Sequence, residues 1–232
     1  MILSLHPDIR IQKLAIGSER RPLIVIDNLI ADPDKLIRRA VTRPYVDLPS
    51  YFPGIRAGAP LAYQHLFETQ LKGMLLDYFQ LENRTFKFQM CHYSLVTRRP
   101  HKLDFLQRIP HIDSVSSHGL ASVHYLFKGN YGGTAFYRHR KTGFEYVDES
   151  RKETYYACLE TEKQGPDAPT EGYINGDTAL YEQIAKHDGV FNRILIYRKN
   201  SLHSGCIDKD FVPDPNPLTG RLSINTFIDV VP

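Results

Sequence analysis

The sequence predicts a mainly β fold with flanking helices, of the sandwich or jelly-roll kind. From residue 85 onward, short runs of apolar and β-branched residues are separated by turn signals at short intervals. Before them, residues 32–79 contain two segments with apolar residues at helical spacing. A chain of 232 residues is most simply one domain and can bury a core without disulfides. We therefore expect a single domain, 1–232, in which an N-terminal strand and helices (1–84) pack on a β core (85–232).

The first part of the chain combines strand and helix signals. Residues 9–16 alternate weakly between apolar and polar, and the apolar, β-branched run at residues 22–26 is a clearer strand. The next element is expected to be a helix, with Asp32 as N-cap and Pro33 at the first helical position. Pro44 is expected to end it, because proline cannot continue a helix.

Residues 44–60 contain four prolines and two glycines, and we expect a loop there. Helical spacing returns at residues 61–79. From residue 86 to Val96, apolar and polar side chains alternate, which predicts a long strand. A basic loop at residues 97–108 then leads to a stretch that contains two polar residues of interest.

Further strands are expected around His111 and Asp113 and at residues 120–127, 134–139, 191–197, 202 onward and 221–230. Residues 147–165 fit either a short helix or a long hairpin excursion. Residues 178–187 predict a helix, with Gly189 just beyond its end.

The bulk composition is that of an ordinary soluble globular protein, with 42% hydrophobic and 24% charged residues. The net charge of +3, from basic residues in scattered pairs, gives no support for nucleic-acid binding. The three cysteines lack metal-ligand spacing, and we expect free thiols in a reducing compartment. No signal-peptide pattern or membrane-spanning apolar run is found. We therefore expect a cytoplasmic protein without a membrane partner.

Two short stretches carry a candidate metal centre. In Pro110-His111-Ile112-Asp113, the alternation of a strand directs His111 and Asp113 to the same face. In Leu202-His203-Ser204, a further histidine follows an apolar strand and a turn. Two imidazoles and one carboxylate that cover one side of a metal and leave positions open suit the non-haem Fe(II) oxygenases.

The last expected strand carries a candidate anion site. Arg221 and Ser223 are two residues apart and therefore share one face of that strand. A cation and a hydroxyl there provide what the anchor of a dicarboxylate needs, because an arginine fork pairs with a carboxylate through two hydrogen bonds. Asn225 lies on the same face and is expected to line the same pocket.

These stretches together resemble a known family. Phe88-Gln-Met-Cys-His-Tyr93, Pro110-His111-Ile-Asp113, Gly132-Gly133-Thr-Ala-Phe136, Ile194-Leu-Ile-Tyr197-Arg-Lys-Asn-Ser-Leu-His203-Ser and Gly220-Arg221-Leu-Ser-Ile-Asn-Thr-Phe227 are similar to the 2-oxoglutarate/Fe(II)-dependent dioxygenases. The prolyl-hydroxylase-like branch is the most similar. The resemblance covers roughly residues 85–230 and extends to the strand-then-helix opening at residues 22–41.

The resemblance implies a double-stranded β-helix, a jelly roll like that of the cupins, as one oxygenase domain. By it, His111, Asp113 and His203 are the catalytic iron ligands, and O2 and the cosubstrate 2-oxoglutarate complete the reaction. Arg221 pairs with the distal carboxylate of 2-oxoglutarate, assisted by Ser223, and Tyr93 donates a hydrogen bond to the same cosubstrate. The implied enzyme is a hydroxylase of a small molecule or of an amino-acid side chain. The oligomeric state is left open.

Two other classes of function remain open at this point. One is a cupin-like metal binder or sensor that keeps the metal triad without being an oxygenase. The other is a structural or partner-binding jelly roll in which the triad is coincidental. The Arg221-x-Ser223 pair favours the oxygenase, because a plain metal binder needs no buried cation near the metal.

Overall fold

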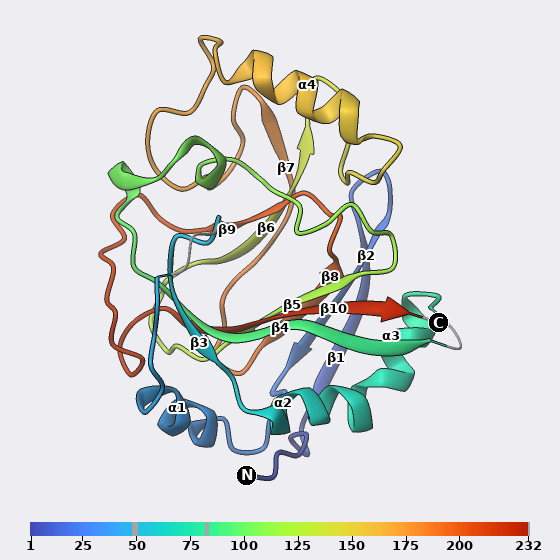
Figure 1. Ribbon diagram of the computed structural model, residues 1–232, viewed down its shortest axis with the longest axis vertical. Coiled ribbons are helices and arrows are strands. Elements are labelled where there is room, and N and C mark those ends of the chain that lie inside the picture. Colours follow the sequence, from blue (N-terminus) through green and yellow to red (C-terminus); the bar gives the residue numbers. More distant parts are fainter. Residues whose placement is uncertain (48–50, 82–83, 232) are drawn as a thin grey trace.

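The structure is a computed structural model and describes residues 1–47, 51–81 and 84–231. Within these residues the strands form a large and a small sheet (Figure 1). The large sheet has seven strands in the order β1-β2-β8-β5-β10-β4-β3. Their bounds are β1 Arg10–Ile16, β2 Arg21–Asp27, β3 Gly54–Gly58, β4 Thr85–Val96, β5 Leu120–Tyr125, β8 Ile194–Arg198 and β10 Leu222–Val231.

The small sheet has three antiparallel strands in the order β7-β6-β9. Its members are β6 Gly133–His139, β7 Tyr181–His187 and β9 His203–Cys206, and helix α4, Lys152–Glu162, lies beyond it in Figure 1. The alternation along β6 explains these layers. Tyr137 packs in a core cluster with Tyr155 and Leu159 of α4, whereas its neighbour Phe136 packs with Leu23 and other residues of the large sheet.

The other face of the large sheet is covered by the N-terminal helices, which lie along the lower side of Figure 1. These are α1 Asp34–Val41, α2 Leu61–Leu66 and α3 Lys72–Tyr78, with a π-helical turn at Phe67–Leu71 between the last two. Ile24, Leu222 and Ile224 of the sheet share one cluster with Leu36 and Phe67 of the helical part. Short 3-10 helices at Pro100–Lys102 and Phe105–Gln107 lie in the basic loop.

The expectation of a mainly β chain with a few helices is confirmed. The strands expected near residues 9–16 and 22–26 are β1 and β2, and they extend the large sheet by hydrogen bonding to it through β8. The segment 147–165, for which the sequence left a short helix and a long hairpin excursion open, contains helix α4. The part of the chain that the structure describes contains no helix long and apolar enough to cross a membrane.

Three local predictions are wrong. Residues 178–187 do not form a helix: Tyr181–His187 is strand β7, because hydrogen bonding to β6 outweighs local helix propensity. The expected loop 44–60 includes β3, which pairs with β4; positions 48–50 of that loop lie outside the described residues. His111 and Asp113 do not lie in a strand; His111 forms only an isolated bridge with His203.

Candidate metal centre and its cavity

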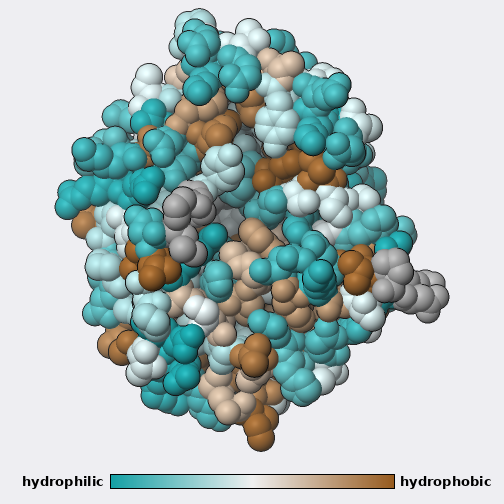
Figure 2. Space-filling model, viewed as in Figure 1, coloured by the Kyte–Doolittle hydropathy of each residue, from teal (hydrophilic) through white to brown (hydrophobic). Residues whose placement is uncertain are grey.

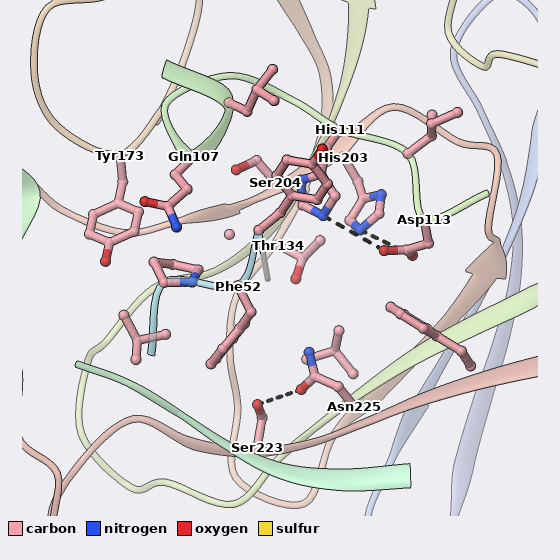
Figure 3. Close-up of a pocket in the computed structure, with 18 of the residues that line it drawn as sticks. Phe52, Gln107, His111, Asp113, Thr134, Tyr173, His203, Ser204, Ser223 and Asn225 are labelled. Atoms are coloured by element: carbon pink, nitrogen blue, oxygen red, sulfur yellow. Dashed lines mark hydrogen bonds and ion pairs between the residues drawn. The ribbon is translucent and has the colours of Figure 1, made fainter. Parts of the chain in front are cut away.

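The three predicted metal ligands come together in the structure. One ligand atom each from His111, Asp113 and His203 lies within 4.8 Å of the other two. Nε2 of His111 is 3.7 Å from Oδ1 of Asp113, and Nε2 of His203 is 3.6 Å from Oδ2 of the same carboxylate (Figure 3). The arrangement is a compact set of two nitrogen donors and one carboxylate.

Backbone hydrogen bonds hold these residues in place. The amide of His111 donates to the carbonyl oxygen of His203 at 2.9 Å, and the amide of His203 donates to that of His111 at 3.0 Å. The amide of Asp113 donates to the carbonyl oxygen of Lys199 at 2.8 Å. The segment 111–113 is therefore positioned by the chain that runs from β8 into β9, without being a strand of either sheet.

The protonation states of these three side chains leave their nitrogen and oxygen atoms available to bind a cation. Burial lowers the pKa of His203 to about 4. The His111 side chain is 43% exposed, and partial desolvation together with the neighbouring His203 lowers its pKa to about 4 as well, so both imidazoles are neutral near pH 7. Nδ1 of His203 lies 2.9 Å from the carbonyl oxygen of Ser201, which assigns the proton to Nδ1 and leaves the lone pair on Nε2. Burial also raises the pKa of Asp113 to about 6, and its Oδ2 is buried without a hydrogen-bond partner.

An uncompensated buried carboxylate oxygen beside two imidazole nitrogens is costly unless something positive binds there. A divalent metal supplies that charge, and imidazole with carboxylate is a donor set that suits Fe(II). The residues present therefore fit a metal of this kind.

The metal centre opens into a cavity of about 410 Å³ between the two sheets. This volume is within the range of small-molecule sites, about 300–1,000 Å³. Figure 3 shows the triad on one side of the cavity and the Ser223–Asn225 pair from the large sheet on the other. In Figure 2, apolar side chains gather near the middle of the molecular face, surrounded largely by hydrophilic ones.

Arg221 lines this cavity and is 5% exposed. Its Nε donates to the carbonyl oxygen of Tyr131 at 2.8 Å, and one terminal nitrogen donates to that of Gly133 at 2.9 Å. No carboxylate of the described residues forms an ion pair with it. Burial lowers the pKa of Arg221, but a guanidinium stays protonated in proteins. The fold thus orients a cation toward the cavity and leaves its charge uncompensated.

Ser223 and Asn225 also line the cavity, as expected from their shared strand face. The hydroxyl of Ser223 donates to Oδ1 of Asn225 at 2.7 Å. The prediction for Tyr93 is wrong. Tyr93 is buried in the core between the large sheet and the helices, and its hydroxyl donates to the carbonyl oxygen of Leu36 at 2.8 Å. Ser94 pairs with Ser223, so alternation places Tyr93 on the opposite face.

Several polar side chains of the cavity were missed by sequence reasoning, among them Arg56, Thr134 and Ser204. Thr134 and Ser204 lie beside residues of recognised stretches, but their hydroxyls carry no signal by themselves. Arg56 lies on β3, in the segment that its prolines and glycines predicted to be a loop. A charged residue between Gly54 and Gly58 was the available signal, and its meaning depends on the pairing of β3 with β4.

Comparisons with known proteins support this picture at the level of the fold. A family model described as "Family of unknown function (DUF6445)" matches residues 7–228. No curated protein matches the chain. Among solved structures, the non-haem α-ketoglutarate-dependent epimerase SnoN from nogalamycin biosynthesis is similar with a TM-score of 0.51 at 11% identity, over 90% of this chain and 78% of that one.

HygX from Streptomyces hygroscopicus, crystallised with nickel and 2-oxoglutarate, is similar with a TM-score of 0.49 at 11% identity, over 94% of this chain and 84% of that one. An N-substituted L-amino acid dioxygenase from Burkholderia ambifaria AMMD gives a TM-score of 0.45 at 9% identity, over 99% of this chain and all of that one. The match to SnoN shows a shared fold, and the chemistry has to be argued from the residues of this chain.

Proposed function

Because this chain belongs to the family described as of unknown function (DUF6445), its activity follows from its own site, and we propose that it is a 2-oxoglutarate- and Fe(II)-dependent oxygenase. The observation that carries the proposal is the convergence of His111, Asp113 and His203, with one carboxylate oxygen buried and unpartnered. These three residues would hold the metal. When bound, Fe(II) with 2-oxoglutarate and O2 supplies the oxidising chemistry.

The protein's own residues orient and separate the reactants. Asp113 contributes the single negative charge of the ligand set, and the bond from His203 to Ser201 fixes the imidazole so that Nε2 faces the metal position. Two imidazoles and one carboxylate are a donor set that suits the non-haem Fe(II) oxygenases, and such a set would leave room for a cosubstrate and O2. The cavity beside these residues is lined from both sheets, by Thr134 of β6 and by Ser223 and Asn225 of β10.

Arg221 is the proposed anchor of the far carboxylate of 2-oxoglutarate. Two of its N–H groups are held by backbone carbonyls, so the guanidinium is oriented before any ligand arrives. Its remaining donors suit a carboxylate, since a charge-assisted pair is stronger than a neutral hydrogen bond. Ser223 and Asn225, which share one face of β10, assist by lining the same cavity.

The proposed reaction is hydroxylation of a small molecule or of an amino-acid side chain. The cavity of about 410 Å³ has room for 2-oxoglutarate and a compact second molecule. We further propose that residues 1–232 form one oxygenase domain with a double-stranded β-helix, related to the prolyl-hydroxylase-like branch. The main core cluster supports one domain, because it joins Leu3 and Leu36 to Ile228 and Val230.

The test is an anaerobic titration of the purified protein with Fe(II) and then with 2-oxoglutarate. We expect a visible charge-transfer absorption band when both are present, and slow consumption of 2-oxoglutarate once air is admitted. Metal binding without any response to 2-oxoglutarate would contradict the oxygenase and support the metal binder or sensor instead. Failure to bind any divalent metal would support a structural protein.

A further inference from the structure

The cavity contains a second arginine at a distance from the first. Arg56 lies on β3 opposite Ser94 of β4, and Ser94 lies opposite Ser223 of β10. The backbone of Arg56 is therefore two strand spacings, about 10 Å, from the backbone of Ser223. Arg221 precedes Ser223 by two residues. Both arginines line the same cavity. Arg56 thus approaches the cavity from β3, and Arg221 approaches it from the position just before β10.

The guanidinium of Arg56 has no polar partner among the described residues. It lies 4.3 Å from the centre of the Phe52 ring, and its Nε is buried without a hydrogen bond. Burial lowers the pKa of Arg56 to about 10, so the group is still a cation near pH 7. The nearby charge of Asp113 favours that cation, but the two residues form no ion pair.

Arg198 provides a comparison within the same chain. Burial lowers its pKa to about 10 as well, and its guanidinium lies 5.7 Å from the ring of Phe79. Arg198, however, donates hydrogen bonds to the carbonyl oxygens of Ser117 and Phe79. The fold therefore satisfies one half-buried arginine with its own backbone and leaves Arg56 to be satisfied by something else.

The charges of the cavity indicate what that partner is. Asp113 is the one acid among the described residues that line it, against Arg56 and Arg221. A divalent metal with Asp113 has a net charge of one positive. The two carboxylates of 2-oxoglutarate neutralise this charge and the charge of one arginine. One positive charge remains. Since a buried unpaired charge is unfavourable, a singly negative molecule completes the site.

We propose that the second molecule of the reaction, the substrate, is a monocarboxylic acid whose carboxylate is bound by Arg56. This inference rests on the proposed function and specifies its substrate class. Phe52, Tyr156 and Tyr173 line the same cavity, so the rest of the substrate is an apolar or aromatic body. Arg56 is a substrate-binding residue that selects the acid and holds it beside the metal centre.

The experiment measures binding to protein loaded with Ni(II) and saturated with 2-oxoglutarate. The probes are matched pairs of an acid and its primary amide: benzoate, phenylacetate, 3-phenylpropanoate, hexanoate and N-acetylphenylalanine. Ligand-observed NMR gives the affinity of each. We expect the best acid to bind at least tenfold more tightly than its amide. Arg56→Met and Arg56→Gln abolish this preference, and Arg56→Lys keeps part of it.

Arg140→Met is the matched control, because it removes one positive charge from an exposed arginine that pairs with Asp177 outside the cavity. It retains the preference for acids. The inference is overturned when acids and amides bind equally, when no acid binds at millimolar concentration, or when the preference survives in both Arg56→Met and Arg56→Gln.

Titration with 2-oxoglutarate separates this inference from the proposed function. In Arg56→Met, the affinity for 2-oxoglutarate is expected to stay within about twofold of the wild-type value. A loss of 2-oxoglutarate binding there makes Arg56 the cosubstrate anchor, which overturns the inference and leaves the oxygenase standing. Absence of 2-oxoglutarate binding to the wild-type protein overturns both.

Discussion

His111 and His203 exchange two backbone hydrogen bonds, of 2.9 and 3.0 Å, and their imidazole rings lie 4.5 Å apart between centroids. Residues far apart in the sequence thus form one rigid pair. The pair faces Asp113, which is positioned separately by the carbonyl oxygen of Lys199. The donor set is therefore fixed by backbone geometry before any metal binds. The contribution of each side chain to metal binding can be tested by replacing that side chain alone.

Replacing His111 by alanine is expected to weaken binding of Fe(II) or Ni(II) by about 100-fold or more, since a ligand matters at least as much as the groups that orient it. The backbone bonds to His203 do not involve the side chain, so the fold is retained. Calorimetric titration with Ni(II) measures the effect. His101→Ala, in the exposed basic loop, is the control and keeps full affinity. Equal losses in both variants would contradict the assignment.

Arg221→Ala is expected to weaken 2-oxoglutarate binding by about 100-fold, as expected for losing a charge-assisted pair. Arg221→Lys restores only part of it, because one ammonium replaces a two-pronged fork. Metal affinity changes little in either variant. The charge-transfer band of the anaerobic Fe(II) protein, followed against 2-oxoglutarate concentration, gives these values. A wild-type titration curve for Arg221→Ala places the anchor elsewhere.

Tyr93→Phe separates the position found in the structure from the role that the family resemblance implied. The variant loses the hydrogen bond to the carbonyl oxygen of Leu36, and we expect the free energy of unfolding to fall by about 1–2 kcal/mol. Affinity for 2-oxoglutarate should not change, because the phenol lies on the far side of the sheet. Urea unfolding and the cosubstrate titration are the two measurements. Weaker cosubstrate binding at unchanged stability would argue against the structure.

His124 makes the protein sensitive to acid. Burial lowers its pKa from 6.5 to about 4. At pH values between about 4 and 6.5, His124 is protonated in the unfolded chain but not in the folded protein. Its contribution to the free energy of unfolding is therefore fully present above about pH 6.5 and is lost as the pH drops toward 4. In His124→Gln, the fall in the free energy of unfolding between pH 7 and pH 5 should be smaller by about 2 kcal/mol. Urea unfolding of both proteins at both pH values measures it, and equal falls would rule the contribution out.

The residues of the candidate metal centre and the Arg221-x-Ser223 pair could be picked out from the sequence because their signals are local. A His-x-Asp triplet, a later histidine after an apolar strand, and an Arg-x-Ser pair each lie within a few residues. The face occupied by Tyr93 was not predictable, since it depends on the register of β4 against β10. A shift of one residue in that register would reverse every side chain of the strand.

The helix prediction for residues 178–187 was wrong for a related reason. The segment contains good helix formers, and only pairing with strand β6 determines that residues 181–187 are extended. Arg56 was missed because a five-residue strand between glycines cannot be told from a loop without its neighbour. Signals within a few residues could be read from the sequence, whereas features that depend on strand pairing could not. The meeting of His203 with His111 and Asp113, which are far apart in the sequence, was expected from the family resemblance.

In strand β3, the position of the backbone does not depend on the side chain that lines the cavity. A side chain at Gly54 would place its Cβ 1.9 Å from the carbonyl oxygen of Leu95, so the pairing with β4 depends on glycine there. Residue 56, in contrast, is held by its main chain, which exchanges two 2.9 Å hydrogen bonds with Val46. The position of residue 56 is thus independent of its side chain. If Arg56 binds the substrate as proposed, a substitution at this one position would change the preferred substrate without displacing the backbone of β3 or the residues of the candidate metal centre.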